Sequence, residues 1–352
     1  MPAFLAKVPA APRDYSACSG CSLCLLVCPM WRSSHDPVFT PEGLAKALQC
    51  GATASELAAP IAACSLCGAC DPVCPERIDL SGMIMDLRRR LANALPSDSP
   101  RPALLDELHA RLQQGAPATA PVASRSVPVL LPGPVLRSDP ALMAQVQALL
   151  GIAVFDDDGD DIALAIEVGV EIPQQRLHAF LDSLRGHSIV AADGLLLRQL
   201  RRWLPGSQRM GLGPALSTRA AVRSNLAPSD LYVIEPRAFH GDYERMVGYY
   251  DRLQRETGCS LSLDLQRIAI PASSSGLEHR LGLVPKRDVL RGVADDDVQA
   301  RWLLQGRTPA RIVVESLADR AAFGRVCDLP VVYLAELGED PEMMKKFRHA
   351  FG

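Results

Sequence analysis

The spacing of hydrophobic residues changes along the chain and divides it into a helical part and a part with strands. Up to residue 95, apolar residues recur every three or four positions, the period of an amphipathic helix. This spacing predicts a helix over residues 41–59, with Thr40 as its N-cap and Pro41 in its first turn. A second helix is predicted after Ile78, where the recurring positions are Met83, Ile84, Leu87 and Leu91. Its arginines, Arg88, Arg89 and Arg90, are expected to form a solvated face in preference to a docking patch.

After residue 127, short runs of apolar and β-branched residues alternate with helical patterns. Such alternation is typical of an α/β fold with a largely parallel sheet. The predicted strands are residues 129–131, 152–155, 162–170, 187–192, 231–235, 260–265, 311–315 and 331–334. The predicted helices are residues 141–150, 173–185, 195–204, 243–256 and 317–326. The pattern of residues 189–204 returns at 312–326, which indicates two related halves.

Length and composition fit an ordinary globular protein. The chain has 352 residues, enough for about two domains with cores of their own, and 48% apolar and 22% charged residues give a net charge of −3. No basic tract interleaved with aromatic residues occurs, so a nucleic-acid partner is not expected. Residues 1–12 hold no apolar stretch like that of a signal peptide, and no run of 18 apolar residues occurs. We therefore expect a cytoplasmic protein, which reaches the inner face of a membrane only through a partner.

Eight of the eleven cysteines form two runs of identical spacing. Each run reads C-x2-C-x2-C-x3-C-P, the spacing of bacterial ferredoxins with [4Fe–4S] clusters. The first three cysteines of a run can surround one cluster, while the fourth points away and binds the other cluster. The sequence thus predicts one cluster bound by Cys18, Cys21, Cys24 and Cys74, and a second cluster bound by Cys64, Cys67, Cys70 and Cys28.

Other uses of the cysteines fit less well. A zinc ribbon has pairs of cysteines without a third member, and disulfides are typical of short secreted chains. The remaining cysteines have no motif partner and are expected to be small buried hydrophobic residues rather than ligands; they are Cys50, Cys259 and Cys327.

These patterns predict an α plus α/β architecture. Residues 1–95 form an α-helical, ferredoxin-like domain with two [4Fe–4S] clusters, and residues 96–128 form a linker that contains a short helical stretch. Residues 129–226 are expected to be the first α/β half, and residues 227–352 the second.

Two further motifs do not predict a site. One acidic segment has carboxylates at positions 1, 3, 5 and 12 of an EF-hand count, namely Asp156, Asp158, Asp160 and Glu167. Asp161 stands where that loop requires glycine, and residues 162–168 are predicted to be a strand, so a solvated acidic turn is expected. Gly211-Leu-Gly-Pro lacks the rest of a G-x-G-x-x-G motif and predicts no nucleotide.

The two cysteine runs, joined by a helical insert and followed by a repeated α/β unit, resemble a known group of iron–sulfur subunits. The group comprises the C and D subunits of heterodisulfide reductase, the C subunit of anaerobic glycerol-3-phosphate dehydrogenase and the iron–sulfur subunit of glycolate oxidase. Its members pass electrons between a flavin dehydrogenase, or a disulfide-reducing site, and a membrane quinone or another carrier. The resemblance covers most of the chain and is closest over residues 18–90.

The second part of the chain departs from that family, whose members usually carry paired Cys-Cys-Gly motifs there. The corresponding segments here are residues 156–161 and 272–276, without cysteine. The family's His-Asp-Pro-Cys segment corresponds to Ile234-Glu235-Pro236-Arg237. A further cluster is therefore not expected, and the α/β part is expected to be a scaffold or a docking surface.

The resemblance implies an electron-transfer subunit without catalytic residues of its own. It would relay electrons between a flavin-dependent dehydrogenase partner and a quinone, membrane or other redox carrier. The alternative is a non-catalytic assembly or regulatory protein with structural or sensing clusters.

Beside the second run, the charges of Glu76 and Arg77 roughly cancel, which leaves Asp71 as an uncompensated charge. The cluster of this run is therefore expected to have the lower reduction potential.

Overall fold

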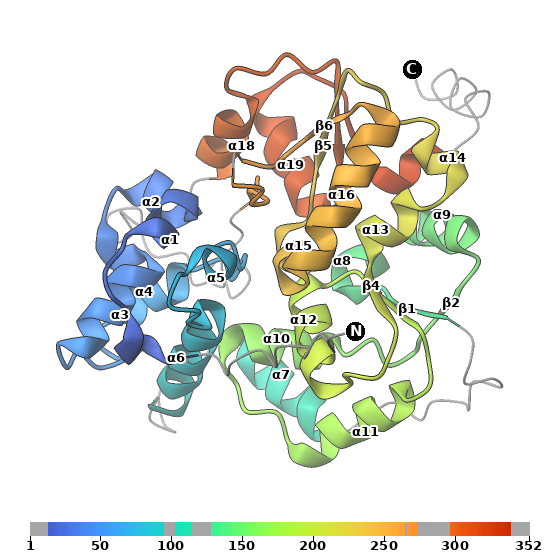
Figure 1. The fold of residues 1–352 in the computed structure, drawn as a ribbon. Coiled ribbons are helices and arrows are strands. Elements are labelled where there is room, and N and C mark those ends of the chain that lie inside the picture. The colour runs from blue at the N-terminus through green and yellow to red at the C-terminus, as the bar shows by residue number, and fades with distance from the viewer. Residues whose placement is uncertain (1–12, 95–102, 115–127, 265, 274–295, 339–352) are drawn as a thin grey trace, which may run out of the picture.

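The helical part of the chain carries both cysteine runs on short elements and ends in a longer helix (Figure 1). The computed structural model describes residues 13–94, 103–114, 128–264, 266–273 and 296–338. In the first of these ranges the elements are η1 (Tyr15–Ala17), α1 (Leu23–Val27), α2 (Pro29–Ser34), η2 (Pro37–Phe39), α3 (Pro41–Gln49), α4 (Ala58–Ala63), α5 (Cys70–Val73) and α6 (Leu80–Ala94).

The predicted helix over residues 41–59 begins as expected but ends early. The Thr40 side chain accepts a hydrogen bond from the Gly43 N–H at 3.2 Å, which confirms it as N-cap of α3. The continuous helix is wrong, because α3 ends at Gln49 and the chain turns through Gly51, whose φ is +91°. A left-handed φ suits glycine and does not continue a helix.

Helix α6 buries its apolar face, as predicted, but its arginines do not all face solvent. Met83, Ile84 and Leu87 are buried. Arg89 and Arg90 keep 60% and 57% of their side chains exposed and pair with Asp86, as expected of a solvated face. Arg88 is only 2% exposed, so this expectation is wrong for that residue.

The α/β part contains two parallel sheets of four strands each. The first consists of β1 (Val129–Leu131), β2 (Ala153–Val154), β3 (Ile189–Ala191) and β4 (Arg209–Gly211), and the second of β5 (Asp230–Val233), β6 (Ser260–Leu261), β7 (Arg311–Val314) and β8 (Val331–Tyr333). The strand orders are β2-β1-β3-β4 and β6-β5-β7-β8, and every pairing is parallel. In each sheet, the strand that comes second in chain order (β2 or β6) lies at one edge, next to the strand that comes first. Both sheets therefore have the same topology. Strand β4 was missed because Arg209–Gly211 lacks an apolar run.

Helices cover both sheets and connect them to the cysteine-bearing part. They are α7 (Ala103–Gln114), α8 (Gly133–Arg137), α9 (Pro140–Leu150), α10 (Asp160–Val168), α11 (Gln174–Leu184), α12 (Gly194–Trp203), α13 (Leu212–Ser217), α14 (Ala220–Arg223), α15 (Pro236–Gly241), α16 (Tyr243–Thr257), α18 (Asp296–Leu304), α19 (Leu317–Val326) and η3 (Leu334–Gly338). Gly151 and Gly258, with left-handed φ of +65° and +76°, are the C-caps of α9 and α16. Figure 1 shows the helices of residues 13–94 grouped on one side, next to α12 and α15.

Residues 162–170 were predicted to be a strand, and this prediction is wrong. Residues 160–168 form helix α10, which packs against α6, α7 and α12. Because three helices surround it, α10 buries side chains around most of its circumference, including Ile162, Ala163, Ala165 and Val168. A helix that is apolar on all sides loses the 3.6-residue period, so its sequence resembles that of a buried strand.

The described part of the predicted linker is helix α7. Its Leu108 and Leu112 pack with Ala165 and Val168 of α10. Residues 96–102 and 115–127 of that linker lie outside the described residues, and the domain boundaries stay predictions. Across the described ranges, no helix combines the length and the apolar character needed to cross a membrane.

Candidate metal centre

Cysteines of both runs meet at one cavity near the surface. Cys18, Cys21 and Cys24 of the first run line it together with Cys74 of the second. Cys24 is buried, Cys18 and Cys74 are half-buried, and Cys21 is exposed. Lys46 stabilises the loop that begins at Cys18, since its Nζ donates to the Cys18 carbonyl at 2.7 Å.

The other four cysteines line a second, deeper cavity. Cys64, Cys67 and Cys70 meet Cys28 of the first run there. Three of the four are buried, and Cys64 is half-buried. The loop turns through left-handed residues at Leu66 and Gly68, with φ of +53° and +77°.

Two short helices explain why each run contributes to both cavities. Helix α1 presents Cys24 to the first cavity and leads directly into Cys28, which lines the second. Helix α5 likewise begins at Cys70 and is followed by Cys74. Four residues along a helix advance the chain by about 6 Å, so the two cavities adjoin. The structure thus brings together both predicted quartets; that these cysteines are the cluster ligands stays a prediction.

The chemistry of the two quartets fits iron–sulfur clusters. All eight cysteines are free thiols. Burial raises the pKa of Cys24 to about 12 and that of Cys67 to about 11, so these thiols need a bound cation to become thiolates. Within the described residues, no three His, Cys, Asp or Glu side chains converge closely enough for one metal ion. Soft sulfur donors spread around a cavity suit a cluster better than a single zinc ion.

Helices α12 and α15 of the α/β part cover the loop of the second run. Arg237 of α15 donates to the Ser65 carbonyl at 2.8 Å from Nη2, and His240 Nδ1 donates to the Cys67 carbonyl at 2.8 Å. Arg198 of α12 donates to Asp71 at 2.7 Å and to Asp79 at 2.8 Å. Asp71 is therefore compensated, and the expectation of an uncompensated charge beside this run is wrong. This pair could not be predicted from the sequence, because Asp71 and Arg198 lie 127 positions apart.

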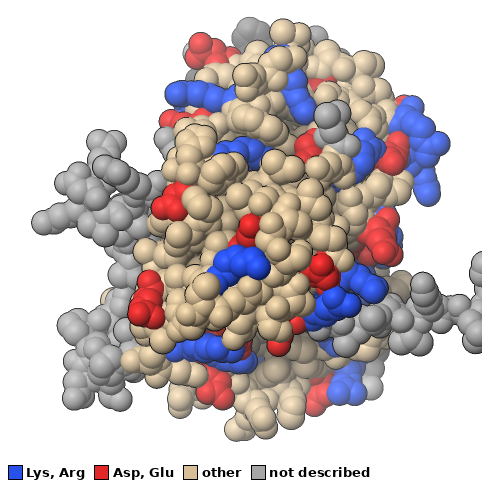
Figure 2. Space-filling model, turned by 60° about the vertical axis from the view of Figure 1, so that its left-hand side comes forward, with Lys and Arg blue, Asp and Glu red and all other residues tan. Residues whose placement is uncertain are grey.

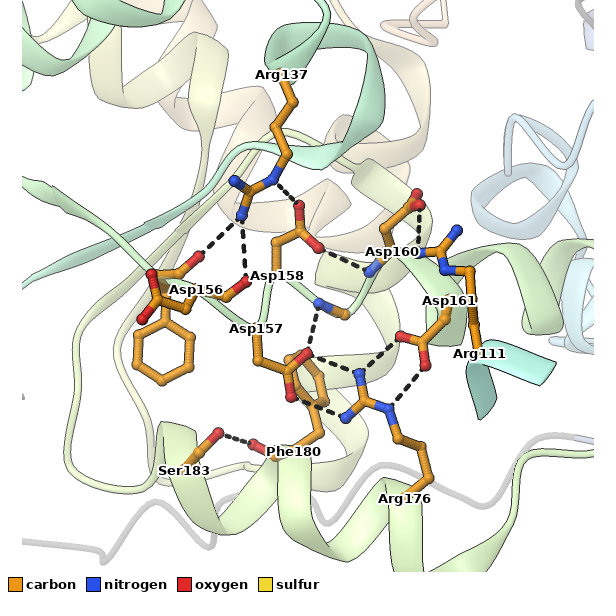
Figure 3. A network of polar contacts seen from close by, with 12 residues as sticks. Arg111, Arg137, Asp156, Asp157, Asp158, Asp160, Asp161, Arg176, Phe180 and Ser183 are labelled. Atoms are coloured by element: carbon orange, nitrogen blue, oxygen red, sulfur yellow. Dashed lines mark hydrogen bonds and ion pairs between the residues drawn. The ribbon is translucent and has the colours of Figure 1, made fainter. Parts of the chain in front are cut away.

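The acidic segment after β2 is a network of ion pairs (Figure 3). Arg176 of α11 lies between Asp157 and Asp161 and donates to both carboxylates at 2.7–2.8 Å. Asp157 and Asp161 are only 3% and 5% exposed, so the prediction of a solvated turn is wrong. The neighbouring carboxylates of Asp158 and Asp160 pair with Arg137 and Arg111. These arginines occupy the oxygens that a calcium ion would need.

The three cysteines outside the runs differ in burial. Cys259 is fully buried, as predicted, and lines neither cavity. Cys327 is half-buried. Cys50 is exposed at the turn after α3, so its expected burial is wrong.

A cleft of about 200 Å³ lies where strands of both sheets end, and it reaches Ser65 and Cys67 of the deeper cavity. Glu315 borders it and accepts hydrogen bonds from the hydroxyls of Tyr232 and Tyr250, both at 2.6 Å. Glu235 caps α15 by accepting from the N–H groups of Arg237 and Ala238. Burial raises the pKa of Glu235 to about 7 and also raises that of Glu315. The cleft was not predicted from the sequence, although Glu235 and Glu315 are the last residues of two predicted strands.

Comparison with known proteins agrees with the cysteine geometry. A family model described as a 4Fe-4S dicluster domain matches residues 14–78. No curated protein and no solved structure matches the chain. The matched segment holds both cysteine runs and ends before α6, so the chain is an iron–sulfur protein with a 4Fe–4S-binding segment of the kind used in electron transfer.

Proposed function

We propose that the chain is an electron-transfer subunit that relays electrons through two [4Fe–4S] clusters within a larger oxidoreductase. The clusters, when bound, supply one-electron transfer, and the chain's residues hold and shield them. The observation that carries this proposal is the crossed arrangement of the cysteines. Because α1 and α5 each connect the two cavities over four residues, the clusters would lie close enough to exchange electrons.

Exposure suggests where electrons enter. Cys21 of the first cavity is exposed, whereas the second cavity lies behind α12 and α15. A partner would therefore exchange electrons at the edge of the first cluster. Figure 2, which turns the helical part toward the viewer, shows charges of both signs interspersed on this face, without a broad patch of one sign. Such a face suits a protein partner better than a polyanion.

The partners follow from the family resemblance of the cysteine runs. We propose a flavin-dependent dehydrogenase as the donor, and a quinone-reactive membrane subunit or another carrier as the acceptor. A carrier of single electrons between them needs no general base or nucleophile, and the chain would have no catalytic residue of its own.

A second candidate is a non-catalytic assembly or regulatory protein that senses through its clusters. It is favoured by the hydrogen bonds that tie the second cysteine loop to α15, from Arg237 to Ser65 and from His240 to Cys67. Loss of the second cluster would free this loop and loosen the contact between the two parts.

Reduction of the anaerobically purified protein separates the two candidates. For a relay, dithionite bleaches the visible cluster absorbance, and a co-purifying flavoprotein with its substrate does the same at a rate limited by docking. Cys21→Ala should abolish the flavoprotein-driven reaction while the deeper cluster still responds to dithionite. Clusters that dithionite reduces but no co-purifying protein reduces or oxidises would favour the regulatory candidate.

A further inference from the structure

Arginine side chains surround the loop of the second cysteine run. Arg88 of α6 is buried and donates to the carbonyls of Ala62 and Cys64. Arg237 reaches the same loop from α15, where two of its nitrogens donate to the Ser65 carbonyl at 2.8 and 3.2 Å. Both guanidinium groups thus point their N–H bonds toward the backbone that encloses the deeper cavity.

Two further basic side chains from the α/β part close over the same loop. A side chain at Gly68 would lie 3.0 Å from the His240 Cβ and 3.3 Å from the Arg198 Nη1, so only glycine allows this approach. Arg32 of α2 lies one helical turn after Cys28, and its backbone N–H donates to the Cys28 carbonyl at 3.4 Å. Guanidinium groups from three separate regions of the chain therefore surround the deeper cavity, namely Arg32 of α2, Arg88 of α6, and Arg198 and Arg237 of the α/β part.

Two of these arginines also pair with carboxylates outside the cysteine run. Arg237 pairs with Glu167 of α10, and Arg198 shares Asp79 with Arg202. Only Asp71 stands within the cysteine run itself, and Arg198 covers it. The charge that faces the deeper cavity is thus predominantly positive.

The surface cavity has more acidic surroundings, although Lys46 also reaches its loop by donating to the Cys18 carbonyl at 2.7 Å. Glu42 and Glu76 line it together with its four cysteines. One oxygen of Glu42, Oε2, is buried and has no hydrogen-bond partner among the described residues. Glu76 pairs with Arg13, which is largely exposed. A carboxylate beside a cluster opposes the arrival of an electron, whereas a guanidinium favours it.

We propose that the α/β part makes the deeper cluster the higher-potential centre, so that the first electron taken up by the protein resides there. Among the residues of the α/β part, Arg237 is the main one whose charge raises the reduction potential of the deeper cluster. This inference rests on the proposed presence of two clusters, and it deepens the proposed relay by giving it a direction, from the exposed cluster inward.

Redox titration of the full-length, cluster-loaded protein, followed by EPR, tests this ordering. Arg237→Gln keeps a donor for the Ser65 carbonyl but removes the charge, and should disfavour reduction of the deeper cluster about tenfold, which is 59 mV for a one-electron couple. Arg237→Lys should restore most of the loss.

Asp71→Asn should raise the midpoint potential of the deeper cluster, and Glu42→Gln should raise only that of the surface cluster. Arg223→Gln, whose side chain bonds to Ser217 and Glu256 within the α/β part, is the matched control and should move neither.

If Arg237→Gln folds poorly, the variants that remove a negative charge, Asp71→Asn and Glu42→Gln, still decide the test. Asp71 follows Cys70 directly, so the signal that moves in Asp71→Asn marks the deeper cluster. The proposal is overturned if that signal is the lower-potential one, or if neither Asp71→Asn nor Arg237→Gln moves it. Two reversible clusters in the reverse order would leave the relay function standing, whereas a protein with fewer than two reducible clusters would overturn both.

Discussion

Arg198 holds Asp71 at 2.7 Å across 127 residues of sequence, and so joins the α/β part to the second cysteine run. The other branch of the same guanidinium binds Asp79 at 2.8 Å, so one side chain bridges the cluster loop and the start of α6. A charge-assisted, two-branched contact of this kind fixes orientation as well as position. The α/β part therefore forms a wall of the deeper cavity in addition to packing beside it.

Exchange of ligands between the runs is the first prediction. Cys74→Ala should damage the cluster held by Cys18, Cys21 and Cys24, because Cys74 lines their cavity. The deeper cluster should retain its four thiolates, and Cys28→Ala should produce the reverse pattern. EPR of the reduced variants measures which signal disappears. Loss of the signal of its own run in Cys74→Ala would show that the ligands are not exchanged.

Iron content is the second prediction. Two [4Fe–4S] clusters require about eight irons per chain. Iron and sulfide analysis of the anaerobically purified protein should give this value. Cys50→Ser, Cys259→Ser and Cys327→Ser should leave it unchanged, since none of the three lines either cavity. A content near twelve, or iron loss in one of these variants, would contradict the assignment.

The buried ion pairs around Arg176 provide a prediction of stability. Arg176→Met leaves Asp157 and Asp161 buried without their partner, which should cost about 3–5 kcal/mol in the free energy of unfolding. Urea titration followed by circular dichroism measures the loss. Adding Asp157→Asn and Asp161→Asn to that variant should recover much of it. Arg185→Ala breaks an exposed pair with Asp182 and should change stability by about 0.5 kcal/mol at most.

Glu235 should make stability depend on pH. Burial raises its pKa to about 7, so the folded protein keeps a proton that the unfolded chain releases near its usual value of 4.5. The contribution of protonated Glu235 to the free energy of unfolding is complete below the pKa of the unfolded chain. It is lost as pH rises through about 7. Glu235→Gln carries no charge and can still cap α15, so it should gain about 3 kcal/mol over the wild type near pH 8.5 and nothing near pH 4. Equal melting profiles for the two proteins across this range would refute the assignment.

Local spacing was enough to predict the cysteine quartets and most regular elements. The C-x2-C-x2-C-x3-C runs fix which thiols can meet, because a loop of three or four residues has few conformations around one centre. The Thr40 cap and the strands at residues 129–131, 231–235 and 311–315 also follow from neighbouring residues, and the structure has them. Each of these features depends on contacts within one turn or along one strand.

Features that depend on long-range packing could not be predicted in this way. Helix α10 has the composition of a strand because three other helices enclose it, and Asp157 and Asp161 are buried because Arg176 reaches them from another helix. Arg88 is one of three consecutive arginines, and only the position of α4 and α10 decides that it is buried. The sequence by itself determined which cysteines meet at the two cavities. The tertiary structure decided which charges surround each cavity, because those charges come from residues far apart in the chain that meet only when the two parts pack together.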